Sequence, residues 1–254
     1  IVVSLNDKDT LAKAFDEFKN QIAAVIIEPI PANNGLLLQE KEYLQYLREI
    51  CTLNGTMLIF DEVISGFRVG FEGAAGYYQI KPDIITYGKI IGGGMPVGCY
   101  GSSAEIMGHV SPDGGVYQAG TLSGNPVAMA AGIAQLGELL RMGFYRDLNN
   151  KTEEFTEAIQ RFATARNYKF RVFGIGSIFW FAFTDKEYIR KAEDIDPASM
   201  EKFKKFHREL INRGIYLGPS GYEVGFISSA HTKIDLEKTK RAIFDSLDLV
   251  FSNK

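Results

Sequence analysis

The segment Met57-Leu58-Ile59-Phe60-Asp61-Glu62 is an apolar run that stops abruptly at two carboxylates. Such a run predicts a strand that is covered on both faces, as in a parallel sheet. Similar strands are predicted at Ile22–Ile27 and Asp83–Tyr87, and a helix with one apolar face is predicted around Glu40–Leu53. This alternation of strands and helices predicts an α/β fold with a mainly parallel sheet and helical crossovers.

The rest of the chain is expected to complete this sheet domain and to form a smaller C-terminal α+β domain. The sheet domain is predicted to span residues 1–130, and residues 131–254 are predicted to form a linking helix and the small domain. Further strands are expected at Ile1–Leu5, Pro96–Tyr100, Lys169–Phe173, Ser177–Phe183, Ile215–Leu217 and Gly225–Ser228, and further helices at Pro126–Leu140, Phe144–Ala165 and Asp235–Phe251.

The composition is that of an ordinary globular protein: 254 residues, 46% hydrophobic and 23% charged, with a net charge of −3. This apolar content excludes a disordered chain, and the lack of a basic run argues against nucleic-acid binding. The apolar runs are far shorter than the roughly 18 residues that a membrane span needs. The chain begins inside an apolar run and without methionine, which favours a longer polypeptide whose N-terminal part is missing here.

The cysteines and histidines show no ligand spacing. Cys51 and Cys99 lie far apart and only three histidines are present, so a disulfide framework and a zinc site are both disfavoured. We expect no metal and a location in the reducing cytoplasm. Cys99 is expected to be a small buried hydrophobic residue.

Two residues are candidates for chemistry, Asp61 and Lys89. Each follows the carboxyl end of a predicted buried strand, where open α/β sheets place their ligand sites. A lysine amine can form a Schiff base with the aldehyde of pyridoxal phosphate, and a carboxylate can pair with the ring nitrogen. Alone, each has a simpler interpretation. Asp61-Glu62 also suits the acidic segment of a nucleotide-dependent ATPase, although the chain has no GxxxxGK[ST] loop, and Lys89 suits a surface lysine.

Three longer stretches are more specific. They are IFDEVISGFRV at Ile59–Val69, GKIIGGGMPVG at Gly88–Gly98 and YQAGTLSGNP at Tyr117–Pro126. Together with Ser220–Phe226 and Ala230–Thr232, they resemble the class III, fold-type-I pyridoxal phosphate enzymes, and within that group the glutamate-1-semialdehyde 2,1-aminomutases. The resemblance implies that residues 1–130 are the C-terminal half of a large cofactor-binding domain.

The resemblance also implies roles around the cofactor, which is pyridoxal phosphate or its pyridoxamine form. Lys89 is expected to form the Schiff base and to move protons between substrate carbons. Asp61 is expected to hold the ring nitrogen, Val63 to pack under the ring, and Asn33 to hydrogen-bond the ring hydroxyl.

Further roles concern the partner subunit and the substrate, because the family builds its sites at the interface of a homodimer. Gly120 and Thr121 are expected to reach the cofactor phosphate of the neighbouring subunit. Glu223 is expected to lie near the amines of a small amino-aldehyde substrate and to take part in catalysis.

The reaction depends on the substrate pocket. Aminotransferases that use 2-oxoglutarate generally need an arginine for the second carboxylate, whereas Gly214–Lys240 contains no arginine and offers Glu223. A carboxylate there repels a dicarboxylate and attracts an amine. We therefore expect an aminomutase that converts glutamate-1-semialdehyde into 5-aminolevulinate by intramolecular amino exchange, for tetrapyrrole synthesis. The alternatives are a class III omega-aminotransferase with an external amino donor and a non-catalytic subunit.

Overall fold

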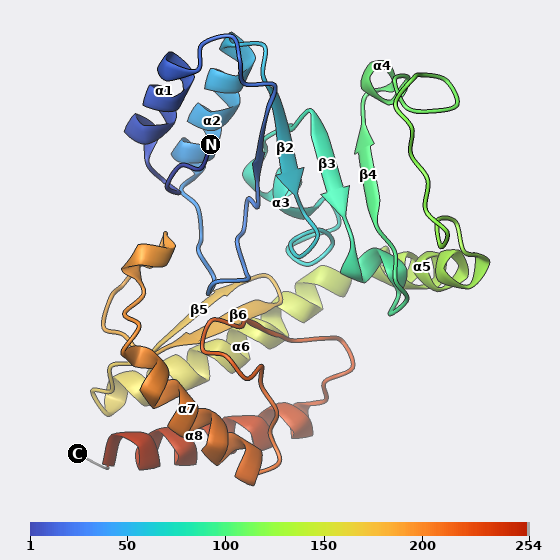
Figure 1. Cartoon of the computed structure of the whole chain (residues 1–254). Helices are drawn as coiled ribbons and strands as arrows, with labels where there is room; N and C mark the ends of the chain where they lie inside the picture. The colour runs from blue at the N-terminus through green and yellow to red at the C-terminus, as the bar shows by residue number, and fades with distance from the viewer. Residues whose placement is uncertain (253–254) are drawn as a thin grey trace. The chain divides into compact units, whose positions relative to one another are not determined.

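The computed structural model describes residues 1–252, which form two compact units (Figure 1). Unit 1 comprises Ile1–Ile30 and Gln39–Phe144, and unit 2 comprises Pro31–Leu38 and the chain from Tyr145 onward. The domain boundary at residue 130 stays a prediction.

Unit 1 contains a four-stranded sheet in the order β1-β2-β3-β4. Strands β1 (Ala24–Ile27), β2 (Met57–Asp61) and β3 (Ile84–Tyr87) are parallel, and β4 (Cys99–Ser102) runs antiparallel to β3. This sheet confirms the predicted fold class, with strands that carry two of the candidate site residues at their carboxyl ends.

The helices of unit 1 follow from capping and apolar periodicity. Helix α1 (Lys8–Glu17) packs against α2 (Lys41–Leu53), and α3 (Gly73–Tyr78) and α4 (Ala104–Met107) are short. Helix α5 (Pro126–Leu139) begins with proline after Asn125, whose side chain accepts hydrogen bonds from the amides of Val127 and Ala128. It packs against the 3-10 turn η1 (Lys89–Gly92), where Gly132 meets the carbonyl of Ile91.

Unit 2 is an antiparallel three-stranded sheet with helices. The strands are β5 (Arg171–Ile175), β6 (Ile178–Ala182) and β7 (Gly225–Phe226), and the helices are α6 (Phe144–Ala165), η2 (Ala192–Asp194), α7 (Ser199–Asn212) and α8 (Lys233–Ser252). Every residue of β6 is buried. Phenylalanine rings of β6 and α7 form the core of this unit together with Phe170 and Phe183.

Several expectations about single segments are wrong. Ile1–Leu5 forms no strand, and Ile1 and Val2 are 76% and 98% exposed, because no strand of the described chain pairs with this run. Ile215–Leu217 is irregular as well, because after Gly214 (φ +73°) the amide of Ile215 bonds back to Leu210 of α7. The predicted strand at Pro96–Tyr100 is displaced to β4, where Cys99 is exposed rather than buried, since β4 has one neighbouring strand among the described residues. Within residues 1–252, no helix has the length and apolar character to cross a bilayer.

Candidate active site

Asp61 ends β2 with one carboxylate oxygen bonded and the other available. Its Oδ1 accepts hydrogen bonds from the amide of Val63 at 3.0 Å and from Thr86 Oγ1 at 3.4 Å. Thr86 is the register partner of Asp61 on β3. Within residues 1–252, Oδ2 of the half-buried Asp61 has no hydrogen-bond partner. The protein thus orients this carboxylate through one oxygen and leaves the other for a donor from outside.

Lys89 follows β3 on the neighbouring strand end, with an exposed side chain and strained backbone. Its φ of +47° lies in the left-handed region, which is uncommon for a residue other than glycine and costs free energy. Gly88 before it lies under Val63, whose Cγ1 would stand 3.2 Å from a Cβ at that position. The structure therefore brings Asp61, Val63 and Lys89 together at the carboxyl edge of two adjacent parallel strands.

Glu62, which sequence patterns suggested only as part of an acidic Asp61-Glu62 segment, organises the chain after Asp61. Its fully buried carboxylate accepts hydrogen bonds from the amides of Ala74 at 2.6 Å and Ala75 at 2.8 Å, and from Ser65 Oγ at 3.0 Å. Burial raises the pKa of Glu62, and these hydrogen bonds oppose that rise. The carboxylate thereby ties the chain after β2 to the first turn of α3.

Gly120 and Thr121 lie in unit 1 with Lys89, and both are exposed. Gly120 lines an apolar groove of about 790 Å³ together with Tyr87, Ile91 and residues of α5. Neither Asp61 nor Lys89 lines this groove.

Asn33 and Glu223 belong to unit 2, where the structure joins their loops. The amide of Gly35 donates to the carbonyl of Tyr222 at 2.8 Å, so the segments Pro31–Leu38 and Ser220–Glu223 lie side by side although they are far apart in sequence. Both Asn33 and Glu223 are exposed. In unit 1 the structure brings Asp61, Val63 and Lys89 together, whereas Gly120 lines a groove that Asp61 and Lys89 do not line. In unit 2 it brings together the loops that carry Asn33 and Glu223.

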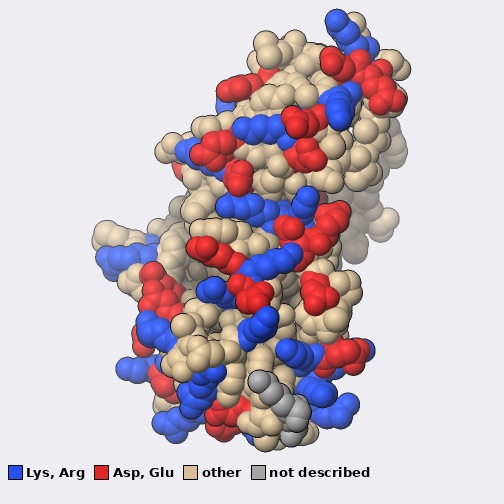
Figure 2. All heavy atoms as spheres, turned by 90° about the vertical axis from the view of Figure 1, so that its left-hand side faces the viewer, with Lys and Arg blue, Asp and Glu red and all other residues tan. Residues whose placement is uncertain are grey.

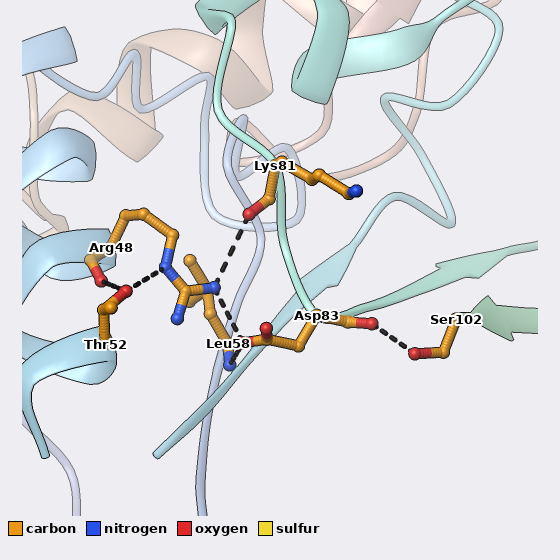
Figure 3. Close-up of polar contacts among 6 residues, drawn as sticks. All are labelled: Arg48, Thr52, Leu58, Lys81, Asp83 and Ser102. Atoms are coloured by element: carbon orange, nitrogen blue, oxygen red, sulfur yellow. Dashed lines mark hydrogen bonds and ion pairs between the residues drawn. The ribbon is translucent and has the colours of Figure 1, made fainter. Parts of the chain in front are cut away.

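The amino ends of β2 and β3 carry a different polar cluster (Figure 3). Asp83 Oδ2 accepts hydrogen bonds from the amide of Leu58 at 2.6 Å and from Arg48 Nη1 at 2.7 Å, and the Asp83 carbonyl accepts one from Ser102 Oγ. Partial burial raises the pKa of Asp83, but the bonds from Leu58 and Arg48 outweigh it and hold the pKa below its usual range. Because these groups satisfy one another, we assign no ligand to the adjoining groove of about 960 Å³.

Comparison with known proteins places the chain in a family. A family model for class-III aminotransferases matches residues 4–242. The chain belongs to the class-III aminotransferase family. On the face of the protein that Figure 2 shows, basic and acidic side chains are interspersed.

Relatives match almost the whole chain. It is 46% identical over 252 residues to a glutamate-1-semialdehyde 2,1-aminomutase of Legionella pneumophila, covering 99% of this chain and 58% of the relative. An enzyme with the same name from Bdellovibrio bacteriovorus is 44% identical over 248 residues, covering 98% of this chain and 58% of the relative. The motif resemblance is thus confirmed, and the chain spans about 58% of the length of these relatives.

Solved structures confirm the fold. An omega-transaminase from Sphaerobacter thermophilus superposes with a TM-score of 0.90 at 29% identity, covering 97% of this chain and 56% of that one. A β-phenylalanine aminotransferase from Variovorax paradoxus gives 0.89 at 28% identity, covering 100% of this chain and 58% of that one.

Proposed function

We propose that the protein containing this chain is a pyridoxal-phosphate-dependent aminomutase that converts glutamate-1-semialdehyde into 5-aminolevulinate, by intramolecular amino exchange, for tetrapyrrole synthesis. The observation that carries the proposal is the 46% identity over 252 residues to an enzyme of that name, together with Asp61 and Lys89 on adjacent strand ends.

The residues of unit 1 fit the cofactor. Asp61 Oδ2, which has no partner among the described residues, is an acceptor for a protonated ring nitrogen. Lys89, three residues after the register partner of Asp61, offers an exposed amine, and Val63 offers an apolar surface. One structural neighbour is a transaminase solved with pyridoxal phosphate bound. When bound, this cofactor acts as an electron sink that stabilises negative charge at a substrate carbon.

Each side chain has a task in the proposed reaction. Asp61 keeps the ring nitrogen protonated, because a nearby carboxylate favours the charged form of its partner. Lys89 Nζ holds the cofactor covalently and then moves a proton between two substrate carbons. Asn33 bonds the ring hydroxyl, and Glu223 attracts the substrate amines while it repels a dicarboxylate. Gly120 and Thr121, just before the start of α5, hold the phosphate of the partner's cofactor.

We also propose that the protein is a homodimer. The chain around α5 exposes large apolar side chains: Leu122 is 62% exposed, Val127 61%, Ile133 73% and Leu140 66%. A large exposed apolar patch of this kind marks an association surface, and Gly120 and Thr121 directly precede it. The proposed cytoplasmic location rests on the free thiols of Cys51 and Cys99.

The second candidate is an omega-aminotransferase, which the TM-score of 0.90 to such an enzyme favours. A donor-free assay separates the two. Purified holoenzyme is incubated with glutamate-1-semialdehyde and no amino donor, and 5-aminolevulinate is measured. We expect repeated turnover. A strict requirement for an external amine would contradict the mutase and support the aminotransferase.

A further inference from the structure

Trp180, the single tryptophan of the chain, lies in β6 at a junction of two loops. It is 1% exposed, and its ring stacks on Phe173 with centroids 5.6 Å apart. Its Nε1–H donates a hydrogen bond to the carbonyl of Gly221 at 2.8 Å. A Cβ at Gly35 would stand 2.8 Å from Cη2 and Cζ2 of the indole, so the backbone at Gly35 lies directly against the ring.

The two loops also contact each other. Gly35 donates its amide hydrogen to the Tyr222 carbonyl at 2.8 Å, next to the Gly221 carbonyl that Trp180 holds. Asn33 lies two residues before Gly35, and Glu223 lies two residues after Gly221. The turn at Glu223 is tight. The amide of Glu223 donates a hydrogen bond to the Ser220 carbonyl at 3.0 Å, and a Cβ added at Gly218 would stand 2.7 Å from the Cβ of Glu223.

We infer that Trp180 is a positioning residue that sets Asn33 and Glu223 together. One rigid side chain fixes both loops, by a hydrogen bond to one and by ring packing on the other, so a change at the indole moves both. This inference rests on the proposed roles of Asn33 and Glu223 in the function above. The contacts of Trp180 described here all lie in unit 2, whereas Asp61 and Lys89 lie in unit 1. Trp180 therefore acts through Glu223 on substrate recognition and through Asn33 on the hydrogen bond to the ring hydroxyl, and it leaves the covalent attachment at Lys89 unchanged.

The test uses hydrogen exchange of the holoenzyme carrying Trp180→Phe, which keeps a ring but removes the Nε1–H donor. The buried Gly221 carbonyl then loses its partner, a loss that costs about tenfold in an equilibrium. We expect the amides of segments 31–38 and 218–226 to exchange about tenfold faster, both together. Gly35→Ala, which crowds the indole and also strains the backbone at φ +78°, should likewise accelerate exchange in both segments.

Phe170→Leu is the matched control. Phe170 is 1% exposed in the same unit and contacts the rings of Phe181, Phe183 and Phe206. This variant should lower the melting temperature without accelerating exchange in the two segments more than elsewhere. If Trp180→Phe accelerates only one segment, or neither segment beyond the control, the inference is wrong.

Kinetics give a second readout. Trp180→Phe should raise KM for the substrate about tenfold, while borohydride still attaches the cofactor to Lys89. An unchanged KM, or loss of the Lys89 attachment, overturns the positioning role. If the holoenzyme does not convert glutamate-1-semialdehyde at all, the proposed function fails, and the paired exchange response still decides whether Trp180 couples the loops.

Discussion

Strands β2 and β3 have an aspartate at each end of the pair, and the two aspartates differ in how fully they are hydrogen-bonded. At the amino end, Asp83 is engaged by Leu58 and Arg48 at 2.6 and 2.7 Å. At the carboxyl end, Asp61 has one oxygen without a partner among the described residues, and Lys89 has a strained backbone at φ +47°. A satisfied polar cluster thus stabilises the sheet, whereas an incompletely satisfied one leaves an acceptor available for a ligand.

The largest effect is expected at the carboxyl end, from Lys89→Ala. Removing the amine that holds the cofactor and moves the proton should lower kcat about 10²–10⁴-fold. The melting temperature of the cofactor-free protein should change little, because the side chain is exposed. The control is Lys81→Ala, which removes an exposed lysine at the amino end of β3 and should leave kcat unchanged. The kcat of both variants is measured on purified protein supplied with the cofactor. If Lys81→Ala lost as much kcat as Lys89→Ala, the catalytic role of the carboxyl end would be wrong.

The same substitution at both ends is the next test. Asp61→Asn should lower kcat about a hundredfold, since a neutral amide no longer favours a protonated ring nitrogen. Asp83→Asn should leave kcat nearly unchanged and reduce the free energy of unfolding by about 1–2 kcal/mol, through loss of the charged bond to Arg48. Steady-state assays and urea unfolding of both proteins check this. The comparison fails if Asp83→Asn is the variant that loses activity.

Sequence alone predicted the carboxyl edge well. A buried strand that ends in a carboxylate or in Gly-Lys places these groups at the carboxyl edge of a parallel sheet, where ligands bind. The register of β2 and β3 then pairs Asp61 with Thr86, three residues before Lys89. The motif resemblance added the roles of these residues. Both signals are local in the chain, so they can be read before the fold is known.

Contacts between distant segments could not be predicted in the same way. Glu62 is buried only because the chain returns 12 residues later, where Gly73 (φ +62°) lets the first turn of α3 meet the carboxylate. Trp180 bonds to a residue 41 positions later. The strand expected at Ile1–Leu5 failed for the related reason that an apolar run needs a partner to become a strand.

Glu62→Gln tests the support behind the carboxyl edge. Three donors converge on the Glu62 carboxylate, and a glutamine must turn its own NH₂ donor toward one of them. We expect a loss of about 2 kcal/mol in the free energy of unfolding, from one unsatisfied buried bond. The exposed Glu49→Gln should change it by less than about 0.5 kcal/mol. Equal stabilities of the two variants in urea unfolding would show that Glu62 has no anchoring role.

The smallest effect is expected in the pH dependence of stability. The contributions of Asp83 and Glu62 to the free energy of unfolding should change with pH in opposite directions. The pKa of Asp83 is lowered from 3.8, so its stabilisation is present above that pH and is lost as the pH falls through the folded pKa. The pKa of Glu62 is raised from 4.5, so its proton-linked stabilisation is present below that pH and is lost as the pH rises through the folded pKa.

Urea unfolding of the wild type and both variants at a series of pH values separates these slopes. As the pH falls from 7 toward 3, the stability gap between wild type and Asp83→Asn should narrow once the pH is below about 3.8. The gap between wild type and Glu62→Gln should instead widen toward pH 4.5. Asp83 is paired with the guanidinium of Arg48, whereas Glu62 is buried among neutral donors. If both stability differences changed in the same direction with pH, this contrast between the two carboxylates would be wrong.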